Sequence, residues 1–200
     1  EAVGHPFFSH LPRFQLTSKL KAFLTPDVLA ATFDHDPLSD AEAQLPDAFH
    51  GWDAFAKSQY LETRGLMPGY ILSSQGDRMT MANSIEGRFP FLDHRLVEFG
   101  AKLPPRLKMA GLDEKHILKN ATKHLVPDSI RQRAKQPYRA PDANSFFDTD
   151  SGMARFEYVD ALLSPAAIAD AGLFDPDVVG KLIDKTRSGA AIGTKDNMAL

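Results

Sequence analysis

The sequence predicts a mainly α-helical fold. Apolar residues recur at helical spacing along most of the chain, and no run of alternating apolar and polar residues is bounded by turns. Several Ser-Pro, Thr-Pro and Asp-Pro pairs place a capping side chain before a proline at the first helical position. Any sheet within these 200 residues should therefore be minor.

Two short helices are expected near the amino terminus. The first follows from apolar residues at helical spacing, Leu16, Leu20, Phe23 and Leu24. The pair Thr25-Pro26 then supplies a cap and a first turn for the second. Residues 35–46 are rich in Asp, Pro and Ser, which favours a loop.

Further helices are expected along the rest of the chain. One begins near Trp52 and ends at Gly65, and another runs from residue 70 to about residue 84. Asp93 is expected to cap the next helix, and Asp113 and Glu114 to open the one after it. Near the carboxyl end, the predicted helix signals are Ser164-Pro165, Gly172 and Asp175-Pro176.

Composition is that of an ordinary globular protein, with 43% hydrophobic and 24% charged residues. A formal net charge of −3 gives no electrostatic footprint for nucleic acid or an acidic membrane. The absence of cysteine excludes disulfides and a cysteine nucleophile from these residues. No apolar run approaches a membrane span and no secretory signal opens the sequence, so we expect a soluble, cytoplasmic protein. The first residue is not Met, which suggests a piece of a longer chain.

Residues 70–93, YILSSQGDRMTMANSIEGRFPFLD, combine many apolar side chains with Asp77, Arg78, Glu86 and Arg88, which are interleaved among them. The apolar residues predict that this segment is largely buried. Buried charges must be paired or used. Asp77 with Arg78, and Glu86 with Arg88, therefore either form ion pairs that tie helices together or belong to a functional site.

Residues 131–141, RQRAKQPYRAP, place four cationic side chains among two prolines and an aromatic residue. A rigid cationic loop can hold phosphate, because Lys135 supplies a point charge and arginines form forked bonds to phosphate or carboxylate oxygens. The alternative is a basic loop that is simply solvated.

The two segments belong to an ordered series of phrases, DRMTMANSIEGRFPFLDHRLVEF, LPPRLK, GLDEKHILKNA and LVPDSIRQRAKQPYRAP. This series resembles the carboxyl-terminal half of glutamine-hydrolysing asparagine synthetases, most strongly over residues 70–147. The resemblance implies that residues 1–200 are the mainly α, helical carboxyl-terminal portion of a synthetase domain. The Rossmann-like α/β core of that domain, with its pyrophosphate loop, is then expected upstream, because its Ser-Gly-Gly-x-Asp-Ser motif does not occur here.

Enzymes of this family adenylate aspartate with ATP and Mg²⁺ and transfer glutamine-derived ammonia, giving asparagine, AMP and pyrophosphate. The resemblance therefore implies that the partners of these residues are aspartate, ATP, ammonia, the α/β core and a glutaminase domain. Without that core, we expect the isolated chain to be inactive and to bind ATP weakly. We also expect an exposed apolar surface capable of self-association.

The resemblance assigns catalytic roles to Lys135, on the phosphates, and to Glu86. Substrate-binding or pocket-wall roles fall to Arg88, Asp77, Arg78 and Arg139. The three histidines of this region lack metal-ligand spacing and are expected to be structural or exposed, and no metal site is predicted: His94, His116 and His124.

Two alternatives remain open. One is a related amide-forming synthetase, similar to the β-lactam synthetases, that acts on another carboxylate. The other is a helical interaction module that docks on a nucleotide-binding subunit without contributing catalytic groups.

Overall fold

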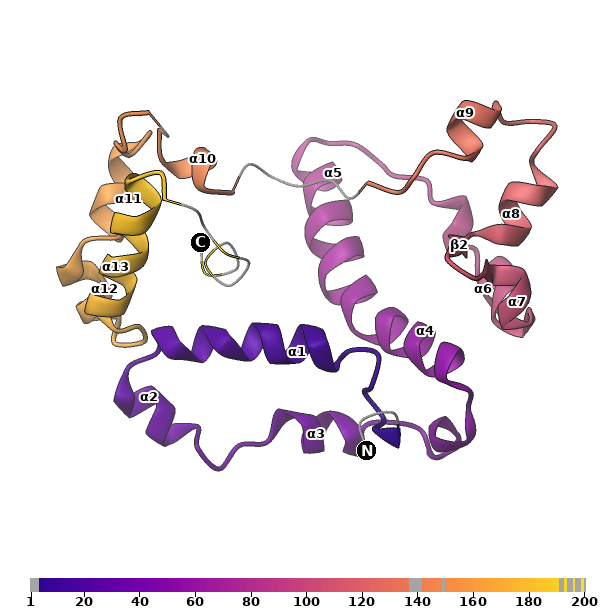
Figure 1. Ribbon diagram of the computed structural model, residues 1–200, viewed down its shortest axis with the longest axis horizontal. Coiled ribbons are helices and arrows are strands. Elements are labelled where there is room, and N and C mark those ends of the chain that lie inside the picture. Colours follow the sequence, from indigo (N-terminus) through magenta and orange to yellow (C-terminus); the bar gives the residue numbers. More distant parts are fainter. Residues whose placement is uncertain are drawn as a thin grey trace. The chain divides into compact units, whose positions relative to one another are not determined.

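The computed structural model describes residues 4–136, 142–148 and 150–190, together with Gly193, Asp196 and Ala199. The chain divides into two compact units, and Figure 1 shows that helices dominate both. Unit 1 comprises Glu1–Ser9 and Pro46–Gln136, and unit 2 comprises His10–Leu45 and Pro137–Leu200. Within the described residues the only sheet has two strands, which confirms the mainly α prediction.

Unit 2 is built from short helices drawn from both ends of the chain. They are α1 (Leu11–Ser18), η2 (Lys19–Phe23), α2 (Pro26–Ala31), α3 (Pro37–Ala43), α10 (Asp142–Phe146), α11 (Glu157–Leu162), α12 (Pro165–Ala171) and α13 (Pro176–Arg187). Two backbone bonds join the two ends. The Thr25 N–H donates to Leu173 O at 3.1 Å, and the Asp175 N–H donates to Phe23 O at 2.8 Å.

The predicted caps of unit 2 are confirmed. Thr25 Oγ1 accepts the Val28 N–H, and Ser164 Oγ accepts the Ala167 N–H. Asp175 Oδ1 accepts the N–H groups of the second and third residues of α13. Gly172 ends α12 with a φ of +69°, a left-handed conformation that glycine adopts without steric strain.

The predicted loop at residues 35–46 is wrong, because α3 forms there. Asp36 Oδ1 accepts the Leu38 N–H at 3.0 Å, and Pro37 occupies the first helical position. This is the same Asp-Pro signature that starts α13. The Asp, Pro and Ser that predicted a loop by composition therefore act as helix-start signals.

A small apolar core holds part of unit 2 together. Phe147, Val159 and Ile183 are buried, and Phe146, Ala154, Leu163 and Val179 pack around them. The Arg187 guanidinium lies 5.3 Å from the centre of the Phe147 ring and pairs with Asp160. Phe147 therefore links α13 to the segment that follows α10.

Unit 1 carries most of the stretch that resembles a known family, from residue 70 to residue 136. Its elements are η3 (Asp47–Gly51), α4 (Ala54–Arg64), η4 (Met67–Asp77), α5 (Arg78–Ala82), η5 (Pro90–Leu92), α6 (His94–Lys102), α7 (Pro105–Lys108), β1 (Met109–Ala110), β2 (Asp113–Glu114), α8 (His116–Ala121) and α9 (Asp128–Arg131). An aromatic cluster of Phe49, Trp52 and Tyr60, with ring centres 5.4–5.6 Å apart, anchors α4 at its start.

The helix predicted from residue 70 begins earlier and is wider than expected. Helix η4 is a π-helix that starts at Met67 and continues through Pro68 and Gly69. The proline lies in the first turn, where its missing N–H has no helical partner to lose, so it does not interrupt the helix. Gly65 ends α4 as predicted.

Asp113 and Glu114 do not open a helix. They form β2, which pairs antiparallel with β1 through Ala110↔Asp113 and Met109↔Glu114. Gly111, with a φ of +61°, allows the two-residue turn between the strands. Strands of two residues are too short to show alternation, so periodicity could not have predicted this hairpin.

The predicted burial of residues 70–93 is also wrong. No residue from Trp52 to Gln136 is buried in the described structure, and Met81 and Phe91 are 70% and 68% exposed. The main neighbours of η4 are α4 and α5, which adjoin it in sequence. Burial requires a covering element, and neither of these helices covers the apolar side chains. The expected exposed apolar surface is therefore present, and self-association through it stays a prediction.

Replacement of Phe147 by alanine should destabilise the chain by about 3–5 kcal/mol, because it leaves a cavity in the unit 2 core. The matched control is Phe33→Ala, which removes a ring that is 85% exposed and should change the unfolding free energy by less than about 0.5 kcal/mol. Urea unfolding followed by circular dichroism measures both. Equal losses for the two variants would contradict this assignment of the core.

Candidate functional site

The turn at the end of α5 positions the first two candidate residues. The Ile85 N–H donates to Thr80 O at 2.8 Å, and the Ser84 N–H donates to Met81 O at 3.1 Å. These two bonds form a Schellman motif, with Ser84 at the left-handed position that glycine usually takes. Its φ of +55° is unfavourable for a residue with a side chain. The turn directs the chain that bears Glu86 and Arg88 away from the helix.

Glu86 and Arg88 form an ion pair. Arg88 Nη1 lies 2.6 Å from Glu86 Oε1, and both side chains are more than 70% exposed. Both residues belong to one segment, so their ion pair does not tie helices together. The alternative that this pair joins two helices is therefore wrong. Between them, Gly87 lies against the Phe89 ring, where an added Cβ would come within 2.5 Å of Phe89 Cζ.

Asp77 and Arg78 lie at the junction of η4 and α5, and both are exposed. Within the described part of the chain, neither forms an ion pair. The Asp77 main-chain oxygen accepts the Thr80 hydroxyl at 3.0 Å, so its contribution to the helix comes from the backbone. The carboxylate and guanidinium of these two residues remain available to solutes.

Asp93 caps α6, as the sequence predicted. Its Oδ1 accepts the Arg95 N–H at 2.9 Å, and the Arg95 guanidinium donates to both carboxylate oxygens at 3.1 and 2.8 Å. The Arg95 side chain and backbone N–H together lower the pKa of Asp93 below its ordinary value. Both oxygens of this carboxylate therefore accept hydrogen bonds from Arg95, a residue of the helix that Asp93 caps.

The basic segment leaves α9 as an exposed stretch that contains Arg133 and Lys135. Arg131, the last residue of α9, donates from Nε and Nη2 to Asp128 Oδ1 at 3.0 and 2.6 Å. Lys135 has neither a hydrogen bond nor an ion pair among residues 4–136 and the later described ranges. Arg139 lies outside the described residues.

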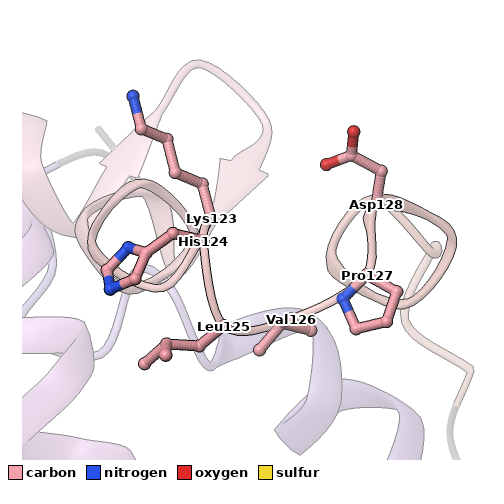
Figure 2. A pocket seen from close by; sticks show the side chains of 6 residues that line it. All are labelled: Lys123, His124, Leu125, Val126, Pro127 and Asp128. Atoms are coloured by element: carbon pink, nitrogen blue, oxygen red, sulfur yellow. The ribbon is translucent and has the colours of Figure 1, made fainter.

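An open concavity lies between the end of α8 and the start of α9. Figure 2 shows the Lys123 ammonium and the Asp128 carboxylate on the same side of it, with the His124 ring turned away. Its lining is one continuous stretch, Lys123, His124, Leu125, Val126, Pro127 and Asp128. Because no second element contributes and none of the predicted site residues lines it, this concavity is a feature of the loop alone.

A hydrogen-bonded network joins β2 to α8. Asp113 accepts from Lys119 Nζ at 2.5 Å and lies 2.8 Å from His116 Nδ1, while Asn120 Nδ2 lies 3.1 Å from His116 Nε2. The bonds from Lys119 and then His116 lower the pKa of Asp113. His116 is thus structural, as predicted, and His94 and His124 are exposed.

The described structure brings together only one pair of the predicted site residues, Glu86 with Arg88. Among those residues, no hydrogen bond or ion pair joins Lys135 to Asp77, Arg78 or the Glu86–Arg88 pair. No group of three His, Asp or Glu side chains in the described ranges is placed to hold a metal ion. Every helix described is too short or too polar to cross a bilayer.

Sequence reasoning missed the role of Ser84 and the pairing of Arg131 with Asp128. The second had a usable signal, since acidic and basic residues three apart on a helix lie on the same face. The first had none, because serine gives no sequence cue for a left-handed conformation.

Comparisons with known proteins agree with the resemblance seen in the sequence. The sequence model of the family described as asparagine synthase matches residues 7–200. The glutamine-hydrolyzing asparagine synthetase 3 of Bacillus subtilis is 46% identical over 98 residues, 49% of this chain and 16% of that protein. Amidase chyE of Penicillium rubens is 41% identical over 96 residues, 45% of this chain and 14% of that protein.

A putative glutamine-hydrolyzing asparagine synthetase of Mycobacterium tuberculosis is 32% identical over 103 residues, 52% of this chain and 16% of that protein. The chain thus spans 16% or less of the length of these three relatives. No solved structure matches it at a significant level.

The Asp113 network makes a pH-dependent contribution to stability. Because the pKa of Asp113 is lower in the folded chain, its ionised form stabilises the fold above about pH 4, and this contribution is lost as the pH falls through the folded-state pKa. Asp113→Asn should therefore lower the thermal midpoint at pH 7, and the gap to wild type should close near pH 2.

The matched control is Asp47→Asn, at an exposed carboxylate in the same unit that has no hydrogen bond or ion pair within the described residues. Thermal unfolding at the two pH values measures both variants. A wild-type gap for Asp113→Asn that is as large at pH 2 as at pH 7 would show that its carboxylate charge does not contribute.

Proposed function

The chain belongs to the asparagine synthase family, and on that premise we propose that it supplies one wall of the catalytic site of an ATP-dependent amide-forming synthetase. In this reaction a carboxylate oxygen of the acceptor attacks the α-phosphorus of ATP, and the bond to pyrophosphate breaks. Ammonia then attacks the acyl carbon and displaces AMP, and the ammonium proton passes to a base.

The observation that carries the proposal is the exposed ammonium of Lys135, which has no partner among the described residues and lies within an acid-free segment. Residues 129–141 contain no Asp or Glu, although the whole chain has a net charge of −3. Negative charge builds on pyrophosphate as it departs, and a fixed cation stabilises that charge more strongly in the transition state than in the ground state. We assign this role to Lys135.

Glu86 is the second catalytic residue that we propose. Its carboxylate is exposed and already holds Arg88, so it can orient that guanidinium or accept the proton released when ammonia attacks. Asp77 and Arg78, which no ion pair occupies within the described residues, are proposed as pocket-wall groups together with Arg88. For Arg139 the proposal depends on the sequence alone.

We propose aspartate as the acceptor and glutamine-derived ammonia as the nitrogen source. The support is that the Bacillus subtilis and Mycobacterium tuberculosis relatives are named glutamine-hydrolyzing asparagine synthetases. An α/β core and a glutaminase domain are proposed as the other parts of such an enzyme, with the isolated chain inactive and weak in ATP binding. The described residues do not fit a Mg²⁺ site, so we assign no step to a metal held by them.

A second candidate is amide chemistry on another carboxylate. It is favoured by the similarity to amidase chyE and to amidase chry2 of Gibberella zeae, which is 38% identical over 96 residues. Competing acceptors tested with one full-length enzyme separate the candidates, since the true acceptor has the highest kcat/KM.

Lys135→Ala, in a full-length enzyme that carries this chain, should lower the synthetase rate by about a hundredfold or more, the loss typical of one electrostatic donor. Pyrophosphate release at saturating ATP and acceptor measures it, and glutaminase activity should persist. The control Lys102→Ala removes another exposed lysine of the same unit and should keep the wild-type rate. A wild-type rate for Lys135→Ala would instead favour the non-catalytic interaction module or a solvated loop.

Glu86→Gln should separate the two half-reactions. A group that takes the proton from attacking ammonia acts only after adenylation, so acceptor-dependent exchange of pyrophosphate into ATP should persist while amide formation falls by about 10²–10⁴-fold. Glu98→Gln, at an exposed glutamate of α6, is the control. Equal losses of exchange and amide formation would indicate that Glu86 acts in adenylation or in substrate binding.

A further inference from the structure

Two neighbouring arginines at the end of α9 differ in their partners and in their exposure. Arg131 is committed to Asp128 through two bonds to one carboxylate oxygen, and its side chain is only 20% exposed. Arg133, two residues later, is exposed and forms no side-chain hydrogen bond or ion pair with any described residue. The composition of the basic segment alone makes both arginines candidates for phosphate.

From this difference we infer that Arg133 is a second phosphate-binding residue, which holds the phosphates of ATP beside Lys135, and that Arg131 is not. The inference rests on the proposed function, because it adds Arg133 as a second phosphate-binding cation to Lys135, which was proposed for the departing pyrophosphate.

The local backbone fixes where Arg133 starts. The Gln132 N–H donates to Asp128 O at 2.9 Å, and the Arg133 N–H donates to Ile130 O at 3.3 Å, so the last turn of α9 reaches as far as Arg133. Lys135 follows two residues later, exposed and outside regular secondary structure. One cation therefore sits at the end of an ordered turn, which reduces the entropy lost when it binds a ligand.

Charge balance gives the second argument. Asp128 neutralises Arg131, and the acid-free sequence from 129 to 141 gives Arg133 and Lys135 no carboxylate of their own. Some basic side chains elsewhere in the described chain pair with a local acid, as Arg88, Arg95 and Lys119 do. Arg133 and Lys135, two residues apart and without a carboxylate partner among the described residues, place two positive charges that a polyphosphate can neutralise together.

The two side chains suit different tasks on such an anion. A guanidinium forms two parallel bonds to phosphate oxygens and fixes their orientation, whereas an ammonium acts as a point charge. Arg133 should therefore contribute mainly to ATP binding, and Lys135 mainly to the charge that develops as pyrophosphate leaves.

The experiment compares Arg133→Ala with Arg131→Ala in the full-length enzyme. Arg133→Ala should raise KM for ATP by about tenfold or more, as expected for the loss of a charge-assisted bond, and leave KM for the acceptor carboxylate unchanged. Arg133→Lys keeps the positive charge but cannot form the two parallel bonds of a guanidinium, so it should give an intermediate KM for ATP. It also serves as the informative variant if the alanine protein fails to fold.

Arg131→Ala is the matched control. It should lower the thermal midpoint, because it leaves Asp128 unpaired, and change KM for ATP by less than about twofold. The inference is overturned if the two alanine variants raise KM for ATP equally, or if Arg133→Ala leaves it unchanged. Lys135→Ala, measured alongside, separates the outcomes. If it lowers the rate at saturating ATP while Arg133→Ala leaves KM for ATP unchanged, this inference fails alone; if Lys135→Ala also keeps the wild-type rate, the proposed function fails as well.

Discussion

The structure depends on side chains that complete the ends of short helices. The longest α-helix in the described residues, α13, has 12 residues, and most are much shorter. Helices of that length are marginal in water when isolated. Each needs partners for its terminal N–H groups, and Asp53, Asp93 and Asp175 supply them directly. In unit 1, where no residue after Trp52 is buried, side-chain caps start α4 and α6, and the other helices described there have no side-chain N-cap bond.

The same local bonds place the proposed catalytic groups. The Schellman motif around Ser84 releases Glu86 and Arg88 from helical geometry, and the Asp128–Arg131 pair closes the short helix before Lys135. A residue with a side chain at positive φ is held there only because the surrounding bonds determine the turn. Glu86, Arg88 and Lys135 therefore follow helix ends, whereas Asp77 and Arg78 lie at the junction of two helices.

Sequence reasoning succeeded where the determinant was local and failed where it was not. Thr25, Ser164, Asp175 and Gly172 acted at helix ends as predicted, because a cap needs only its neighbours. The apolar residues of 70–93 predicted burial, but burial depends on what covers a helix, and periodicity does not supply that. Glu86 and Arg88 could be recognised from the sequence as an ion pair. Their exposure could not be predicted, because it depends on which other elements pack over them.

The exposed apolar side chains of unit 1 and the pairing of its charged side chains can then be explained together. The exposed apolar side chains of residues 70–93 leave apolar area in water, which is unfavourable for a free surface, and Arg133 and Lys135 have no carboxylate partner among the described residues. The same features are favourable as the wall of a site. Apolar side chains can pack on another element and exclude water, and exclusion of water strengthens each charge that faces a phosphate. Asp128 neutralises Arg131, so among the described residues that follow α9, Arg133 and Lys135 are the cations that we propose for the nucleotide.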